Sequence, residues 1–117
     1  MVVHNVHNKE EFTNALKEHE VVIVDAFATW CGPCKAIAPI LANLSNDEKN
    51  EDLHFIKIDV DEVPDLSQEL GIRAMPTFLI FQNGEKAQEI VGANPPALTQ
   101  AIAKFAEVVN AKKSSSA

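Results

Sequence analysis

Hydrophobic and polar positions follow two different periods along this chain, one typical of strands and one typical of helices. Residues 21–28 are almost all apolar and begin with β-branched side chains, which predicts a strand buried on both faces of a sheet. Residues 53–60 and 77–81 predict two further strands. Asn83-Gly84 is a strong signal for a tight hairpin turn, so residues 85–91 should return antiparallel to residues 77–81.

Four helices are predicted around these strands by apolar residues at helical spacing. Asn8 followed by Glu11 has the spacing of a capping box, which marks the start of the first helix. Pro33 fits the first turn of the second helix and Gly71 fits the end of the third. Asn94-Pro95 fits the start of the last. The apolar stripes comprise Phe12, Ala15 and Leu16; Ile37, Leu41 and Leu44; Val63, Leu66 and Leu70; and Leu98, Ala101, Ile102, Phe105 and Val109.

The order of these elements predicts an α/β fold with a central mixed sheet and helices on both of its faces. Strand–helix–strand units favour parallel pairing, and the hairpin adds an antiparallel pair. Residues 2–6 are a weaker candidate for one more strand. Residues 1–110 form one predicted domain, and residues 111–117, rich in Lys and Ser, read as a frayed polar tail.

Composition and charge exclude several classes of function. The 117 residues include 10 basic and 17 acidic side chains, for a net charge of −7, so binding to nucleic acid is not expected. No apolar run approaches the roughly 18 residues that a membrane span needs. The N-terminal residues lack the pattern of a secretory signal, which favours a cytoplasmic location.

The only two cysteines, Cys31 and Cys34, lie where a buried strand ends and a helix begins. A helix N-terminus favours negative charge, so the reactive thiolate of Cys31 should be stabilised there. Cys34 follows one helical turn later, within reach for a disulfide. This pattern favours disulfide exchange, in which one sulfur attacks and the other resolves. Three alternatives stay open: inert buried cysteines, half of a zinc site, and a structural disulfide.

Four other residues are candidates for the same site. Asp25 lies inside the most apolar strand, where burial should raise the pKa of its carboxyl group, and it could exchange a proton with a thiol. Lys57 lies among apolar residues and either tunes Asp25 or extends to solvent. Pro76 precedes a strand and could follow a cis peptide bond. Trp30, the only tryptophan, could form an apolar docking surface or belong to the core.

The segment Ala28-Thr29-Trp30-Cys31-Gly32-Pro33-Cys34-Lys35 resembles the active site of the thioredoxin family. The likeness extends over nearly the whole chain, to about Asn110. It includes Asp25, Lys57, Ala74-Met75-Pro76-Thr77, Asn83-Gly84 and Gly92. The resemblance implies the thioredoxin fold, a central mixed sheet of five strands flanked by four helices.

The resemblance also implies a protein-disulfide reductase mechanism. Cys31 would attack a substrate disulfide, Cys34 would release the reduced product, and Asp25 would assist proton transfer, with Lys57 beside it. Substrate would bind to the backbone at Ala74 and Met75 and to an apolar rim. The implied rim residues are Trp30, Gly32, Pro33, Met75, Pro76, Val91, Gly92 and Ala93.

The same resemblance implies the partners. A thioredoxin reductase that uses NADPH would recycle the oxidised protein, which would bind no cofactor or metal of its own and would serve many disulfide-containing proteins. Electron transport and cell redox homeostasis are the implied processes. The alternative is a thioredoxin-like binding module that docks one partner through the Trp30/Pro76 rim, with incidental thiols.

Overall fold

The structure of the protein is a computed structural model that describes residues 2–115. Its helices and strands alternate as the sequence predicts, including the weaker candidate strand near the N-terminus. In chain order the elements are β1 (Val3–Asn5), α1 (Lys9–Glu18), β2 (Val21–Phe27), α2 (Gly32–Asn46), the short 3₁₀ helix η1 (Glu48–Asn50), β3 (His54–Asp59), α3 (Pro64–Glu69), β4 (Thr77–Gln82), β5 (Glu85–Val91) and α4 (Pro95–Ser115).

The five strands form one mixed sheet in the order β1-β3-β2-β4-β5. β1, β3 and β2 are parallel, β4 is antiparallel to β2, and β5 is antiparallel to β4. The central strand β2 is buried along nearly its whole length, as its continuous apolar sequence predicts. The hairpin turn between β4 and β5 has Asn83 and Gly84 at positive φ, which these two residue types adopt most readily.

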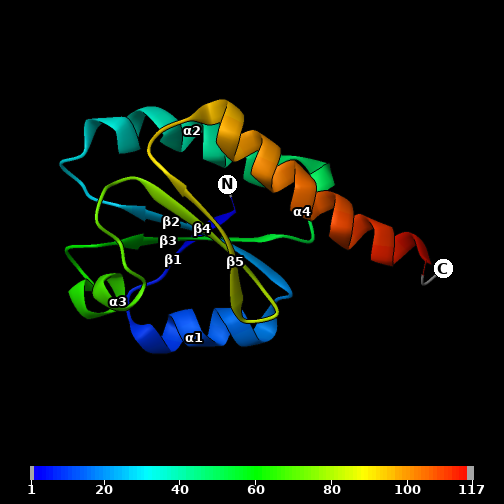
Figure 1. Cartoon of the computed structure of the whole chain (residues 1–117), viewed down its shortest axis with the longest axis horizontal. Coiled ribbons are helices and arrows are strands. Elements are labelled where there is room, and N and C mark those ends of the chain that lie inside the picture. Colours follow the sequence, from blue (N-terminus) through cyan, green and yellow to red (C-terminus); the bar gives the residue numbers. More distant parts are fainter. Residues whose placement is uncertain (1, 116–117) are drawn as a thin grey trace.

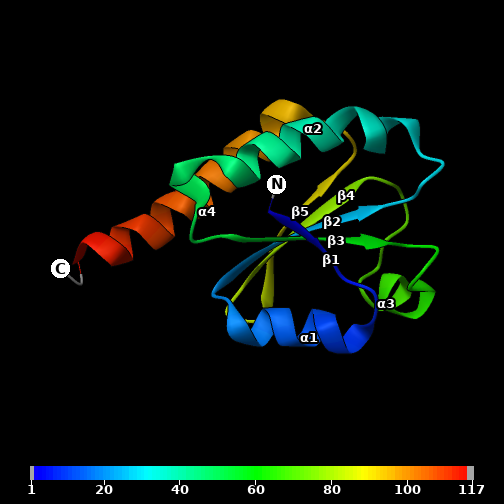
Figure 2. The ribbon, with the colours of Figure 1, turned by 180° about the vertical axis from the view of Figure 1, so that it is seen from behind.

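The helices cover both faces of the sheet. Figures 1 and 2 show α1 and α3 on one face and α2 and α4 on the other. Because side chains alternate along a strand, β2 contributes to two separate hydrophobic cores. Val22 and Val24 pack on the side of α1, whereas Val21 and Ile23 pack on the side of α2 and α4.

The polar residues that the sequence places before helices cap them. The Asn8 side chain accepts a hydrogen bond from the Glu11 amide at 2.8 Å. Asn94 accepts one in the same way from the Ala97 amide at 3.1 Å. Because each cap satisfies an amide with no partner inside the helix, it fixes where α1 and α4 begin.

The last helix is longer than the sequence predicts. α4 continues to Ser115, so residues 111–115 extend the helix where we expected a frayed tail; the other two residues of that segment lie outside the described residues. Two basic side chains in this last turn explain the difference. Lys112 lies 2.6 Å from Glu20, and Lys113 lies 2.8 Å from Asp52 and 3.1 Å from Glu51. Cations at a helix C-terminus are favourable, and these pairs attach the helix end to the domain.

Candidate active site

The two cysteines lie at the start of α2, directly after the loop that follows β2. A disulfide joins Cys31 and Cys34, whose Cα atoms are 5.3 Å apart. Cys31 is the N-cap of α2, and Pro33 lies in its first turn. The Cys34 amide donates a hydrogen bond to Cys31 Sγ at 3.2 Å. Because this amide has no partner inside the helix, it can stabilise negative charge on that sulfur when the disulfide is reduced.

Exposure does not distinguish the two cysteines, since Cys31 is 5% and Cys34 6% exposed. Their surroundings do distinguish them. Cys31 Sγ lies at the helix N-terminus and 3.5 Å from the carbonyl oxygen of Met75, on the side of the Met75-Pro76 segment. Cys34 instead lines a cavity beneath the helix. The first sulfur therefore faces the Met75-Pro76 segment, and the second faces the internal cavity.

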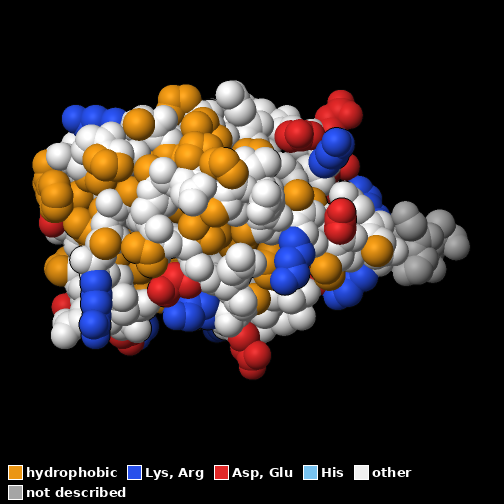
Figure 3. All heavy atoms as spheres, turned by 45° about the horizontal axis from the view of Figure 1, so that its top comes forward, with side chains coloured by type: hydrophobic (Ala, Val, Ile, Leu, Met, Phe, Trp, Pro, Cys, Tyr) orange, Lys and Arg blue, Asp and Glu red, His pale blue; other side chains and the backbone are white. Residues whose placement is uncertain are grey.

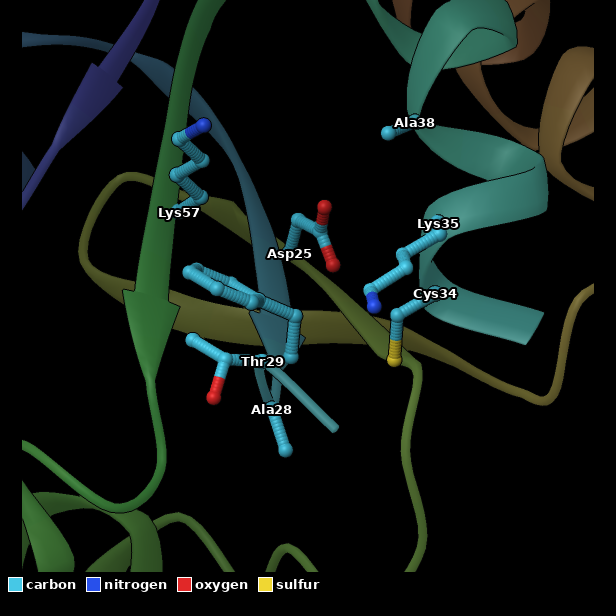
Figure 4. A pocket seen from close by; sticks show the side chains of 8 residues that line it. Asp25, Ala28, Thr29, Cys34, Lys35, Ala38 and Lys57 are labelled. Atoms are coloured by element: carbon cyan, nitrogen blue, oxygen red, sulfur yellow. The ribbon is translucent and has the colours of Figure 1, made fainter. Parts of the chain in front are cut away.

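The cavity beneath α2 has a volume of about 290 Å³ and brings Asp25 and Cys34 together. Figure 4 shows Asp25 reaching into it from β2, with Cys34, Lys35 and Ala38 on the α2 side and Lys57 on β3. Lys35 belongs to the sequence motif, but its place on this cavity was not predicted.

Asp25 is buried, as its apolar neighbours predict, and is 5% exposed. Within the described part of the chain, its Oδ1 atom is buried without a hydrogen-bond partner. Burial raises the pKa of the carboxyl group from 3.8 to about 7, and the charge of Lys57 acts in the opposite direction. A group with a pKa near 7 can both accept and return a proton at neutral pH, which suits general acid–base chemistry.

Lys57 lies directly opposite Asp25 in the parallel pairing of β2 and β3. Its side chain is partly buried, and Nζ lies 5.7 Å from the centre of the Phe27 ring. Its charge lowers the pKa of Asp25, which is the effect that the electrostatic interpretation predicts.

Replacing Lys57 with Met should therefore raise the pKa of Asp25 above its value of about 7, because the buried carboxylate loses the positive charge that lowers its pKa. NMR titration of the Asp25 carboxyl carbon measures the change. Lys35→Met is the matched control, since it removes another cation that lines the same cavity but does not contribute to the shift at Asp25. An unchanged Asp25 pKa in Lys57→Met would contradict the electrostatic role.

The predicted rim residues gather around Cys31. The peptide bond between Met75 and Pro76 is cis, and the Gly92 amide donates to the Pro76 carbonyl at 2.8 Å. This contact brings the end of β5 beside the Met75-Pro76 segment.

The rim residues differ in exposure. Trp30 is 67% and Val91 58% exposed. Gly32, Pro33, Ala74 and Ala93 are also exposed, Met75 and Gly92 are half-buried, and Pro76 is buried. Figure 3 shows hydrophobic side chains gathered toward the end of the molecule where α2 begins.

Sequence reasoning missed one residue that positions this rim. Asp61 accepts a hydrogen bond from Trp30 Nε1 at 2.9 Å, which holds the indole ring in place although the residue is exposed. The Asp61 amide in turn donates to the Asp59 side chain at 2.9 Å. A sequence signal for this contact was present, because Asp61 lies two residues after β3 and the carboxyl ends of the parallel strands β2 and β3 meet at one edge of the sheet.

Two further observations limit the kinds of site in the described residues. No group of three or more His, Cys, Asp or Glu side chains there is arranged to hold a metal ion. No described helix combines the length and the apolar character needed to cross a membrane.

Comparison with known proteins gives a consistent result. The protein-family model for thioredoxin matches residues 3–104. The chain is 58% identical over 102 residues to Thioredoxin-2 of Pyricularia oryzae, covering 87% of this chain and 58% of that longer relative. It is 48% identical over 101 residues to Thioredoxin-1 of Schizosaccharomyces pombe, covering 86% of this chain and 96% of the relative.

A solved structure of Plasmodium falciparum thioredoxin superposes on this chain with a TM-score of 0.84 at 43% identity. The superposition covers 88% of this chain and 99% of that structure. The five-stranded sheet with four helices thus confirms the predicted fold. From the family match, the high identity and the joined cysteine pair, we conclude that the chain belongs to the thioredoxin family of thiol–disulfide oxidoreductases.

Proposed function

We propose that the chain reduces disulfide bonds in other proteins and that Cys31 is the attacking nucleophile. The observation that carries this assignment is the hydrogen bond from the Cys34 amide to Cys31 Sγ at the start of α2. A thiolate in that position is stabilised by the amide and by the helix dipole. In the first step Cys31 forms a mixed disulfide with one substrate sulfur, and the other substrate sulfur leaves and takes up a proton.

Cys34 completes the reaction by attacking Cys31 Sγ. Its thiol passes a proton to Asp25, the Cys31–Cys34 disulfide forms, and the second substrate sulfur leaves as a thiol. Asp25 then returns that proton to the departing sulfur. Overall the substrate gains two electrons from the cysteine pair and two protons, one from the Cys34 thiol and one from the solvent, which received it when Cys31 ionised. Support for the role of Asp25 comes from the cavity that it shares with Cys34 and from its pKa of about 7.

Substrate binding is assigned to the rim around Cys31. Trp30 and Val91 offer exposed apolar surface, and the Ala74-Met75 backbone lies beside Cys31 Sγ. An extended substrate segment placed there would bring its disulfide to that sulfur. Because the rim is apolar and exposed, it suits contact with many protein substrates.

The oxidised protein would be reduced again by a thioredoxin reductase that draws its electrons from NADPH. We place this cycle in the cytoplasm, as part of electron transport and cell redox homeostasis, because a chain with one close cysteine pair is typical of a reducing compartment. A coupled assay with purified thioredoxin reductase, NADPH and insulin tests the proposal. NADPH oxidation that depends on both the chain and insulin supports it, and its absence contradicts it.

Replacing Cys34 with Ser should trap substrates, because Cys31 can still attack but nothing resolves the mixed disulfide. After incubation with cell extract, we expect many proteins bound to the variant and released by dithiothreitol. The doubly substituted form, with Ser at both positions, is the matched control and should trap none. One partner that binds both forms equally and resists dithiothreitol would favour the binding-module alternative.

A further inference from the structure

Three histidine side chains from distant parts of the chain stack on one another. His54, the first residue of β3, lies between the other two. Its ring centre is 3.7 Å from that of His19, with 9° between the ring planes, and 4.9 Å from that of His4, with 21° between the planes. We call these three residues the histidine stack. The histidine stack could not be predicted from the sequence, because the spacing of the three residues matches no ligand pattern.

The histidine stack joins three elements at the end of the sheet farthest from Cys31. His4 lies on β1, His19 caps the C-terminus of α1, and His54 begins β3. β1 is a short edge strand that pairs with β3 alone. The ring contact between His4 and His54 therefore adds to a small number of backbone pairs that hold β1 against β3.

Stacked imidazole rings respond strongly to protonation. Neutral rings attract one another as other aromatic pairs do, whereas two charged rings at this separation repel. The face-to-face arrangement also argues against a metal site. Ring nitrogens coordinate in the plane of the ring, so stacked rings do not direct their nitrogens at one point, and no metal-binding group is found among the described residues.

Carboxylates around the histidine stack offer charged rings other partners. Glu11 and Glu18 of α1 line the same hollow as all three rings. Glu20 and Lys17 line a second hollow with His19, and Asp47, Glu48 and Glu51 line a third with His4 and His54. Lys17 is the cation that lines these hollows, and Glu20 and Glu51 are also paired with Lys112 and Lys113. An outer ring that gains a proton is therefore drawn toward nearby carboxylates as well as repelled from its neighbours.

We propose that the histidine stack is an acid-sensitive clasp that holds the edge strand β1 against β3 at neutral pH and releases it when the rings are protonated. Release would uncover the outer edge of β3, whose backbone groups could then pair with another strand. The inference does not depend on the proposed disulfide chemistry, which takes place at the opposite end of β2.

The direction of the pH effect follows from His54. Burial lowers the pKa of His54 from 6.5 to about 4, and the neighbouring charges of His19 and His4 lower it further. When β1 opens, His54 loses its contact with His4 and becomes more exposed, so its pKa rises toward 6.5 and it binds a proton more readily. The closed state is therefore fully favoured above about pH 6.5 and loses this advantage as the pH falls toward 4.

Hydrogen–deuterium exchange of the oxidised protein tests the clasp, after correction for the intrinsic pH dependence of exchange. Amides that bond β1 to β3, including the Val6 amide bonded to the Lys57 carbonyl, should lose roughly tenfold in protection between pH 7.5 and pH 5. Amides at the centre of β2 and β4 should lose much less. Equal loss throughout the sheet, or no loss in β1, would overturn the proposal.

Two variants make the test specific. His54→Phe keeps an aromatic ring but cannot be protonated, so the loss of β1 protection should fall below about twofold. His4→Phe, at an exposed position, should partly reduce the acid-induced loss of β1 protection. It replaces His54→Phe in the test if that variant does not fold. His7→Gln is the matched control: His7 lies outside the stack and pairs with Glu62 at 2.9 Å. The same acid response in both Phe variants as in the native chain would overturn the proposal.

Discussion

Replacing Cys31 with Ser should abolish the reduction of insulin disulfides, leaving only the rate of dithiothreitol alone. We expect a fall of at least about a hundredfold, because a serine hydroxyl is neither ionised at neutral pH nor able to form a disulfide. The turbidity of precipitating insulin chains measures the rate. The substitution is nearly isosteric, so circular dichroism of the variant should show an unchanged fold.

The roles of the two sulfurs are separated by comparing Cys31→Ser with Cys34→Ser. Both variants should lose turnover, but only Cys34→Ser should form a mixed disulfide with one equivalent of a disulfide substrate. The reason is positional: the Cys34 amide bonds to Cys31 Sγ, whereas Cys34 lines the internal cavity. If Cys31→Ser formed the mixed disulfide instead, the assignment of attacker and resolver would be reversed.

Local sequence signals predicted most of the fold. The continuous apolar run of β2, the cap residues Asn8 and Asn94 and the Asn83-Gly84 turn each act through neighbours a few residues away. They are therefore readable without knowing the rest of the structure. The end of α4 could not be predicted from local sequence, because Lys112 and Lys113 pair with side chains more than sixty positions away.

The site divides in the same way. The cysteine pair and the buried Asp25 were predictable because strand, turn and helix start are contiguous in sequence. The position of Lys57 opposite Asp25 depends on the register between β2 and β3, which the sequence alone does not determine. The hydrogen bond from Trp30 to Asp61 and the histidine stack also join separate elements, so only the folded chain brings them together.

Asp25→Asn should stabilise the oxidised protein, and the gain should grow with pH. In the folded chain the pKa of Asp25 is about 7, against 3.8 for the ordinary group. Between these values the unfolded chain has released the proton and the folded chain retains it. The stability of the native protein therefore falls as the pH rises from 4 to 7. Above pH 7 the loss in the free energy of unfolding levels off at about 4 kcal/mol.

Urea denaturation at pH 4, 6 and 8 measures this gain. Asn has no proton to lose, so the variant and the native chain should be similar near pH 4 and differ most at pH 8. Glu85→Gln, an exposed site at the start of β5, is the matched control and should show no comparable gain. The histidine stack changes stability in the opposite direction with pH and is present in every form, so it cancels in the comparison. A gain independent of pH would contradict the raised pKa.

The same substitution should slow the release of reduced substrate. Without the carboxylate, Cys34 loses its nearby proton acceptor, and general-base assistance of this kind contributes roughly 10²–10⁴ to a rate. Stopped-flow measurement of the second step in native protein should show a rise in rate centred near pH 7, absent in Asp25→Asn. Proton transfer from Cys34 would then explain why the chain has a buried carboxylate at this position although it costs several kcal/mol of stability. If the two pH profiles coincided, Asp25 would have no part in the resolving step.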